Sequence, residues 1–377
     1  MMYRYFSIVV IGLMLAGVAH AGESMEASSV PKGLKGVTIG GVYYLHYQNG
    51  ESSSQTYNKF KVSRAYLTVK KKILPFLSSR ITMDISQDDT GDIKVRAKYA
   101  YAHFKFQDMG FITNPNLELG LVHMPWLDFE EHINYYRMQG HMFMEESHLF
   151  NSADFGFTLG GYFGGELDDE YKKTVNKKYA GRFGSFAVGA YNGGGYHAKE
   201  KNENKTIESR LTVRPLPDII PGAQISYFGI FGKGNQAPDS TDENPDWMLT
   251  AIMFSYEHRY LTLTGQFIAG DGNQKGTFAE TTSNANGDIL TRTSNSIQGM
   301  SLFGEGKLGS NWRVIGRFDS FDENTDVDDD EHTRIIVGAG YDFGHHNILI
   351  ADYQIIDYAA SDIDNDTRLQ VTMQIHY

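Results

Sequence analysis

The last residues of the chain, Thr367–Tyr377, read TRLQVTMQIHY. The side chains alternate strictly between two faces, and the apolar face comprises Leu369, Val371, Met373, Ile375 and Tyr377. Alternation with a period of two predicts a β-strand with one apolar and one polar face. The polar face is too hydrophilic for a soluble core, and the aromatic at its end suits a membrane–water interface. Because lipid does not tolerate unpaired strand edges, such a strand predicts a closed barrel.

The rest of the chain repeats this rhythm. The other segments that alternate are 36–48, 60–71, 79–87, 93–106, 117–124, 153–163, 186–192, 206–214, 223–231, 247–259, 261–270, 296–308, 312–321, 333–343 and 347–358. Their connections alternate between short turns and longer polar loops. We therefore predict an all-β fold, a transmembrane antiparallel up-and-down β-barrel of about 16 strands. A barrel of about 16 strands is wide enough for an aqueous channel, whereas about 8 would be filled by side chains.

Alternation also divides the strand residues between lipid and lumen. In 93–106 it places Tyr99 and Tyr101 on the apolar face. The basic residues that it predicts to line the pore are Arg64, Arg80, Lys94, Arg96, Lys98, Arg210, Arg313 and Arg317. Two connections are less regular, since 164–185 is either one long connection or contains a strand extension, and 271–295 is a polar loop of low complexity.

Composition limits the class of protein. The first 21 residues have one charge, Arg4, before an apolar run and end on Ala19-His20-Ala21, so we predict a signal peptide over 1–21 and a barrel domain over 22–377. A membrane anchor is the alternative, but the apolar run is shorter than the roughly 20 residues a spanning helix needs. The chain has no cysteine, so it forms no disulfides. Its net charge of −12 argues against nucleic-acid binding.

One connection, Pro125–Ser152, interrupts the alternation after the fifth predicted strand. Long connections in compact folds are usually functional. A hole of about 16 strands is too wide to select small solutes, so we predict that this segment folds inward and constricts it. Its candidate constriction residues are Trp126, Asp128, Glu130, Glu131, Arg137, Glu145 and Glu146. The alternative is a surface loop that projects outward.

The sequence contains no catalytic motif, so no catalytic residue and no enzymatic activity are predicted. GxSxG, the Walker loop and HExxH are absent, and the GxGxxG match at 304–309 lies at the end of a predicted strand and not after one. The acidic runs at 326–331 and 362–366 lack the glycine and distal glutamate of an EF-hand loop, and His132, His141 and His148 fit no metal motif. We predict neither a metal site nor a cofactor.

The stretch LGLVHMPWLDFEE … FMEESHLFNSADFGFTLGG resembles the phosphate-selective porin O and P family, with Gly120, Pro125, Met144, Glu145 and Gly156 at the positions of its pattern. FAVGAYNGGG and SRLTVRPLP resemble its seventh-strand loop and eighth strand. The resemblance implies an inward loop after the fifth strand and a trimer. Phosphate specificity in that family rests on clustered basic residues at the constriction, whereas this segment has one arginine, Arg137.

Together these features predict an outer-membrane porin for passive diffusion of small hydrophilic, anionic solutes. A basic wall opposite an acidic segment would filter ions by charge. The expected partners are outer-membrane lipid, lipopolysaccharide, small solutes and two further copies of the chain, and not nucleic acid. The alternative is a structural sleeve that surrounds a partner protein, which requires an empty lumen.

Overall fold

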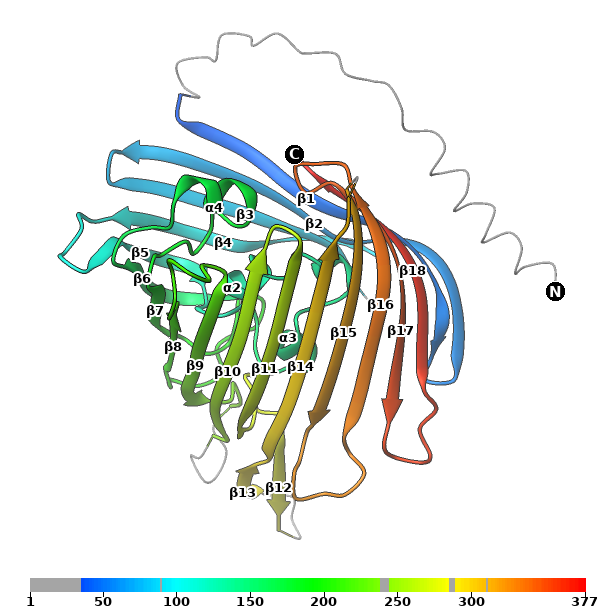
Figure 1. The fold of residues 1–377 in the computed structure, drawn as a ribbon. Helices are drawn as coiled ribbons and strands as arrows, with labels where there is room; N and C mark the ends of the chain where they lie inside the picture. Colours follow the sequence, from blue (N-terminus) through cyan, green and yellow to red (C-terminus); the bar gives the residue numbers. More distant parts are fainter. Residues whose placement is uncertain (1–34, 89, 238–243, 285–288, 310) are drawn as a thin grey trace. The chain divides into compact units, whose positions relative to one another are not determined.

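The strands close into a barrel in the computed structural model, which describes residues 35–88, 90–237, 244–284, 289–309 and 311–377 (Figure 1). The barrel strands are β1 (Val37–Ser52), β2 (Gln55–Leu74), β3 (Leu77–Gln87), β4 (Ile93–Lys105), β5 (Ile112–His123), β6 (Ala153–Phe163), β7 (Gly184–Tyr191), β8 (Thr206–Val213), β9 (Ala223–Lys233), β10 (Asp246–His258), β11 (Leu261–Asp271), β14 (Ser296–Lys307), β15 (Trp312–Asp322), β16 (His332–Asp342), β17 (Ile348–Tyr358) and β18 (Asp366–His376). The predicted signal peptide, 1–21, lies outside the described residues.

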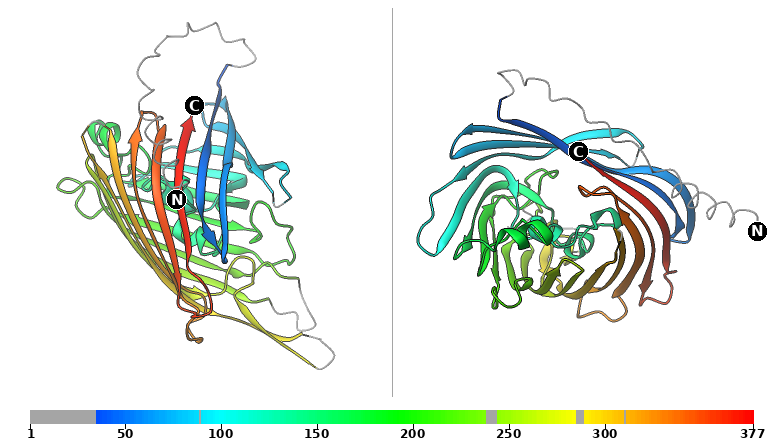
Figure 2. Two further views of the ribbon diagram at one scale, coloured as in Figure 1. Left: turned by 90° about the vertical axis from the view of Figure 1, so that its right-hand side faces the viewer. Right: turned by 45° about the horizontal axis from the view of Figure 1, so that its top comes forward.

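The predicted antiparallel barrel of 16 strands is confirmed. Each strand pairs with its neighbours in sequence, and β1 closes the ring on β18 in a register that runs from Val42↔His376 to Glu51↔Thr367 (Figure 2, right). Between β11 and β14, in the predicted polar loop of low complexity, the chain forms a hairpin of β12 (Ala279–Ser283) and β13 (Ile289–Ser294), which the sequence did not predict.

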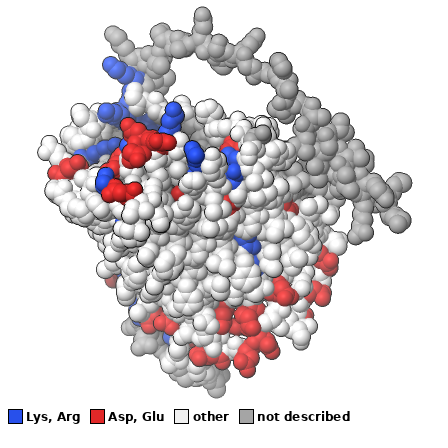
Figure 3. Space-filling view, viewed as in Figure 1, with Lys and Arg blue, Asp and Glu red and all other residues white. Residues whose placement is uncertain are grey.

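Burial is inverted relative to a soluble protein. On β18 the polar residues Gln370, Thr372 and Gln374 are at most 5% exposed. Large apolar side chains such as Phe254 on β10 and Val337 on β16 are instead more than half exposed. The outer wall shows a nearly uncharged band, and acidic residues gather at the end that carries the β12–β13 hairpin (Figure 3). This arrangement suits a wall whose outer solvent is hydrocarbon.

A β-bulge changes which residues of β4 face inward. Thr82 pairs with Tyr99 and Met83 with Ala97, so Lys98 is the extra residue. The register shift turns Tyr99 and Tyr101 inward, where they are 6% and 9% exposed, while Lys98 stays inward as well. Our placement of the two tyrosines on the lipid face was therefore wrong, because strict alternation carries no sign of an inserted residue.

Within the described residues, helical structure is confined to the connections. It consists of α2 (Leu127–Glu131), η2 (Arg137–Gln139) and α3 (Phe143–Glu146) between β5 and β6, and α4 (Asp169–Thr174) between β6 and β7. None of the helices in the described part of the chain is long and apolar enough to cross a membrane. We call the barrel end that carries the β12–β13 hairpin the loop end and the opposite end, where α4 lies, the turn end (Figure 1).

Candidate pore

The connection between β5 and β6, which we call the 124–152 segment, is bonded to the inner face of the wall. It begins beneath β8, where Arg210 Nε donates to the Pro125 carbonyl at 3.1 Å. On β11, Gln266 Nε2 donates to Glu130 Oε1 at 2.7 Å. Arg210 and Gln266 both face inward from their strands. They can therefore bind a segment that is far from them in the sequence but lies inside the barrel.

The second half of the segment continues along the same wall. Tyr136 donates to Glu305 on β14 at 2.7 Å. Its other wall contacts are Arg317 Nη1 on β15 to the His141 carbonyl at 2.7 Å, Arg334 on β16 with Glu146 at 3.1 Å, and Gln370 Nε2 on β18 to the Met138 carbonyl at 3.1 Å. The segment is therefore held from β8 to β18 by way of β11, β14, β15 and β16.

Aromatic side chains fill the space between the segment and this wall. Trp126 is fully buried against Phe228 of β9, with ring centroids 5.1 Å apart, and Phe143 lies 6.3 Å from Phe321 of β15. Trp126 Nε1 also donates to Glu130 Oε2 at 2.8 Å. Buried aromatic pairs of this kind add stability beyond their area, so the segment and the wall share one hydrophobic core.

The carboxylates of the segment have partners within the molecule. Arg137 forms ion pairs with both Glu131 and Glu145. Burial opposes the ionisation of Glu145, but the positive charge of Arg137 prevails and keeps the pKa of Glu145 below its ordinary value. Asp128 lies beside His123 and His132 and accepts a hydrogen bond from Tyr179 at 2.5 Å. Glu146 pairs with Arg334 and His141.

Glu130 differs from the other carboxylates of the segment because its partners are uncharged. It is 4% exposed and accepts hydrogen bonds from Trp126 and Gln266, with no cation at ion-pair distance among the described residues. Burial raises the pKa of Glu130 to about 7, although both hydrogen bonds oppose the rise.

The eight basic residues predicted to line the pore fall into three groups. Four are paired with carboxylates, as Lys94–Asp88, Arg96–Asp84, Arg313–Asp342 and Arg317–Asp319. Arg210 faces inward as predicted but is 1% exposed beneath the 124–152 segment, so it does not line open lumen. The remaining three, Arg64, Arg80 and Lys98, form no ion pair with any carboxylate of the described chain.

These three cations lie on the adjacent strands β2, β3 and β4, which no hydrogen bond or ion pair among the described residues joins to the 124–152 segment. Arg64 and Arg80 are partly exposed, whereas Lys98 is only 3% exposed. Lys98 Nζ donates to Tyr66 Oη at 3.0 Å. Arg80 stacks over Tyr99, 4.7 Å from the ring centroid, and its Nη1 lies 3.1 Å from His123 Nε2. Tyrosine rings and hydroxyls thus contact Lys98 and Arg80. We call Arg64, Arg80 and Lys98 the basic strip.

Two further connections reach this region, and the sequence did not predict their contacts there. Tyr196, between β7 and β8, donates to Asp84 at 3.3 Å, and its ring lies 5.6 Å from the guanidinium of Arg96. The connection 164–183 contacts the 124–152 segment through Asn176 and Tyr179. Its length was visible in the sequence, but nothing in the sequence indicates its contacts.

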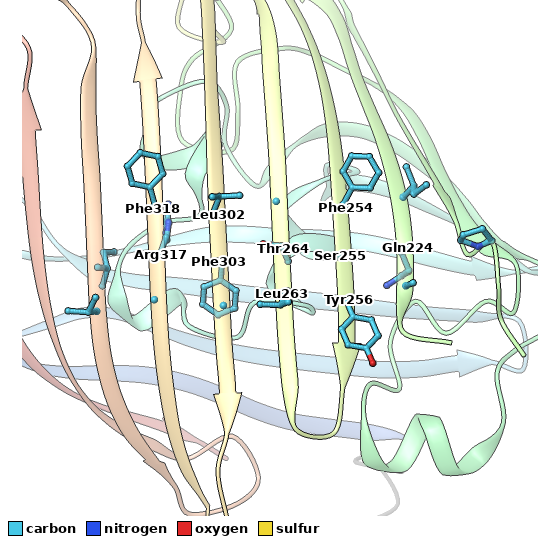
Figure 4. A pocket seen from close by; sticks show the side chains of 18 residues that line it. Gln224, Phe254, Ser255, Tyr256, Leu263, Thr264, Leu302, Phe303, Arg317 and Phe318 are labelled. Atoms are coloured by element: carbon cyan, nitrogen blue, oxygen red, sulfur yellow. The ribbon is translucent and has the colours of Figure 1, made fainter. Parts of the chain in front are cut away.

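The outer wall carries an apolar groove that is separate from the lumen. Phe254, Leu302 and Phe318 project around it (Figure 4), and Gly265 and Gly304 also line it. These side chains lie on the exposed apolar face. The described residues contain no group of three histidine, aspartate or glutamate side chains that could hold a metal ion.

A closed barrel of 16 strands with an inward-facing polar lining has the architecture of outer-membrane porins. Solved structures with this fold include OmpF of Salmonella typhi, with 12% identity and a TM-score of 0.61 over 90% of this chain and 97% of that one. An anion-selective porin from Comamonas acidovorans has 10% identity and a TM-score of 0.57 over 90% of this chain and 99% of that one. The outer membrane channel DcaP of Acinetobacter baumannii has 12% identity and a TM-score of 0.55 over 90% of this chain and 97% of that one.

At these identities the likeness shows the fold alone. No family model matches the chain, and no curated protein matches it either. The resemblance to the phosphate-selective porin O and P family therefore stays a prediction, while the porin fold is confirmed.

Proposed function

We propose that the chain forms a water-filled channel for the passive diffusion of small hydrophilic solutes, with a preference for anions. The observation that carries this proposal is an imbalance of pairing across the lumen. The basic strip has three cations with no carboxylate partner in the described chain, whereas the five carboxylates of the 124–152 segment are paired or hydrogen-bonded. An excess of positive charge in a narrow low-dielectric passage raises the local concentration of anions.

The 124–152 segment is proposed as the constriction. Support comes from its bonds to six strands between β8 and β18 and from the view into the barrel, where its helices lie within the ring of strands (Figure 2, right). The water path would then run between this segment and the wall of β1–β4. A sleeve for a partner protein is disfavoured, because a lumen filled on one side leaves little room for such a partner.

The setting of the channel is part of the same proposal. We place it in the bacterial outer membrane, exported by the signal peptide 1–21 and surrounded by lipid and lipopolysaccharide. A homotrimer is proposed because OmpT of Vibrio cholerae, which shares the fold at 11% identity and a TM-score of 0.56, has a trimer form. Anion transport accords with the printed description of the Comamonas porin. Nothing among the described residues favours a catalytic role over transport.

The test is ion selectivity of the purified full chain in planar lipid bilayers. The reversal potential in a gradient of potassium chloride should have the sign of an anion-selective channel. Neutralising the basic strip with Arg64→Gln, Arg80→Gln and Lys98→Gln should lower the anion-to-cation permeability ratio by about tenfold. The matched control removes three exposed lysines outside the proposed constriction, Lys72→Gln, Lys105→Gln and Lys205→Gln.

The control should keep the selectivity of the unmodified protein. A cation-selective reversal potential of the unmodified protein would refute the anion preference. Equal effects of the strip variant and the control would show that selectivity follows total charge and not the basic strip.

A further inference from the structure

The connection 164–183 is unusual for its position. It lies at the turn end, where the neighbouring connections 75–76, 106–111, 214–222, 259–260 and 343–347 are short. Barrels of this class have brief turns at one end, and a long connection inside a compact fold is usually functional.

The connection has an ordered base. Glu166 and Gly181 form an antiparallel bridge, and Arg182 N donates to the Gly165 carbonyl at 2.9 Å. α4 begins at the side-chain cap of Asp168, which accepts from Tyr171 N at 2.7 Å. A cap and a bridge satisfy backbone groups that would otherwise need water, so the connection holds a defined shape.

Its tip, 176–179, is fixed both to the wall and to the proposed constriction. Asn176 Nδ2 donates to Glu257 Oε1 of β10 and to the His132 carbonyl, both at 2.7 Å. Tyr179 donates to Asp128 at 2.5 Å and packs edge-on against Phe129, 5.1 Å away. The tip therefore lies against the turn-end side of the 124–152 segment.

Two exposed lysines, Lys177 and Lys178, lie at this tip between the anchors Asn176 and Tyr179. The anchors contact β10 and, through Arg210 over the Tyr179 ring at 5.0 Å, β8. In the ring of strands, β2 is eight places from β10 and β18 is eight places from β8, so they lie on the opposite wall. Lys178 is close enough to interact electrostatically with Lys70 of β2.

Lys177 interacts electrostatically with residues of the opposite wall near β18. Its positive charge acts on His346, in the turn between β16 and β17, and on His376 of β18. Burial, followed by the neighbouring His376, lowers the pKa of His346, and Lys177 adds to the lowering. Neither lysine forms an ion pair with a described carboxylate.

We propose that Lys177 and Lys178 are specificity-determining residues of a second filter, a basic collar at the turn-end mouth of the channel. The proposal rests on the proposed function and adds that anions pass faster in one direction than in the other. Small inorganic and organic anions arriving from the turn end meet the collar before the basic strip. Anions arriving from the loop end meet the acidic outer loops first. Anion flow from the turn end is therefore the faster direction at low ionic strength.

The experiment uses single channels of the full chain with a known orientation. Because the chain has no cysteine, Asp169→Cys on exposed α4 gives one thiol that reports which chamber faces the turn end. The chloride current is measured in both directions at about 10 mM salt, where the screening length is roughly 30 Å. The difference between the two directions is then compared with the same difference at about 1 M salt.

The test variant Lys177→Gln/Lys178→Gln should lose at least half of the excess current from the turn end at low salt and match the unmodified protein at high salt. The control Lys105→Gln/Lys173→Gln removes the same charge from exposed positions at the same end and should keep the asymmetry. Lys178→Glu should reverse the asymmetry.

A symmetric current in the unmodified channel at low salt would overturn the collar, as would equal currents for the test variant and the control. The proposed function fails on a different result, namely the absence of channels or a cation-selective reversal potential at every salt concentration. Heat-modified mobility in detergent confirms that each variant is a folded barrel before its current is compared.

Discussion

The two sides of the lumen are built on opposite principles. From β8 to β18, by way of β11 and β14, the covered side of the wall is joined to the 124–152 segment by hydrogen bonds and by the ion pair of Arg334 with Glu146. We call β2–β4 the uncovered side, because no hydrogen bond or ion pair among the described residues joins it to the segment. Its cations contact tyrosine side chains and have no carboxylate partner in the described chain. The covered side contributes stability and the uncovered side contributes charge to the passage.

The difference teaches that charge in the sequence is a poor guide to charge in the pore. The segment contains more acids than bases, yet Arg137 alone pairs two of its glutamates, and burial raises the pKa of Glu130 to about 7. Buried ion pairs contribute little net stability, but breaking one leaves a costly unpaired charge. The covered side should thus be sensitive to single neutralisations, and the uncovered side should tolerate them.

The largest expected effect is that of Arg137→Met. It leaves Glu131 and Glu145 without their cation in a mostly buried site, which should cost about 3–5 kcal/mol of unfolding free energy. The measurement is the urea midpoint of the barrel in detergent, with single-channel conductance as a second readout, since a released segment widens the passage. Adding Glu131→Gln and Glu145→Gln to Arg137→Met should restore most of the loss. Unchanged stability of the single variant would contradict the pairing.

Glu130 supplies the next effect, a pH dependence on the covered side. A carboxyl whose pKa rises from 4.5 in the unfolded chain to about 7 binds its proton more tightly when folded. Its contribution to stability is therefore full below pH 4.5 and is lost as the pH rises through 7, on the order of 2–3 kcal/mol in all. Thermal unfolding between pH 5 and 8 measures it.

The matched variant is Glu130→Gln, which stays neutral and can donate to Gln266 Oε1, an atom without a partner. It should remove this part of the pH dependence and be the more stable protein at pH 8. A pH dependence that is the same in both proteins would assign it to other groups.

A smaller effect is expected where the two long connections meet. Tyr179→Phe removes the hydroxyl that donates to Asp128 and keeps the ring against Phe129, so the loss should be about 1–3 kcal/mol. Denaturation in urea measures the change in unfolding free energy. Tyr227→Phe on the exposed outer face is the control and should be neutral. Equal midpoints for the two variants would show that the contact contributes no stability.

Much of the fold followed from local pattern. Alternation over Thr367–Tyr377 and over the other segments predicted the strands, because successive side chains of a barrel strand point in turn to the lipid and to the lumen. The bulge at Lys98 and the partners of Arg137 could not be predicted in this way. The bulge depends on how β3 and β4 pair, and the ion pairs depend on how a segment without periodicity folds against distant strands.

The candidate site shows the same limit. Alternation predicts that Arg64, Arg80 and Arg210 face inward, but it cannot tell that the 124–152 segment covers Arg210. The connection 164–183 was seen as irregular, and its insertion was not predicted, since its contacts through Asn176 and Tyr179 are tertiary.

The smallest effect on stability is expected from Arg64→Gln on the uncovered side, and it is the sharpest test of the comparison. Arg64 has no carboxylate partner in the described chain and stacks on Tyr66, 5.6 Å from the ring centroid. Its neutralisation should change the unfolding free energy by no more than about 0.5 kcal/mol, because no buried charge is left unpaired. Selectivity should fall nonetheless, since the charge faces the passage. Arg137→Met and Arg64→Gln each remove one positive charge, so urea midpoints and reversal potentials measured side by side separate the two walls. A large loss of stability in Arg64→Gln would mean that the uncovered side is held by its cations after all.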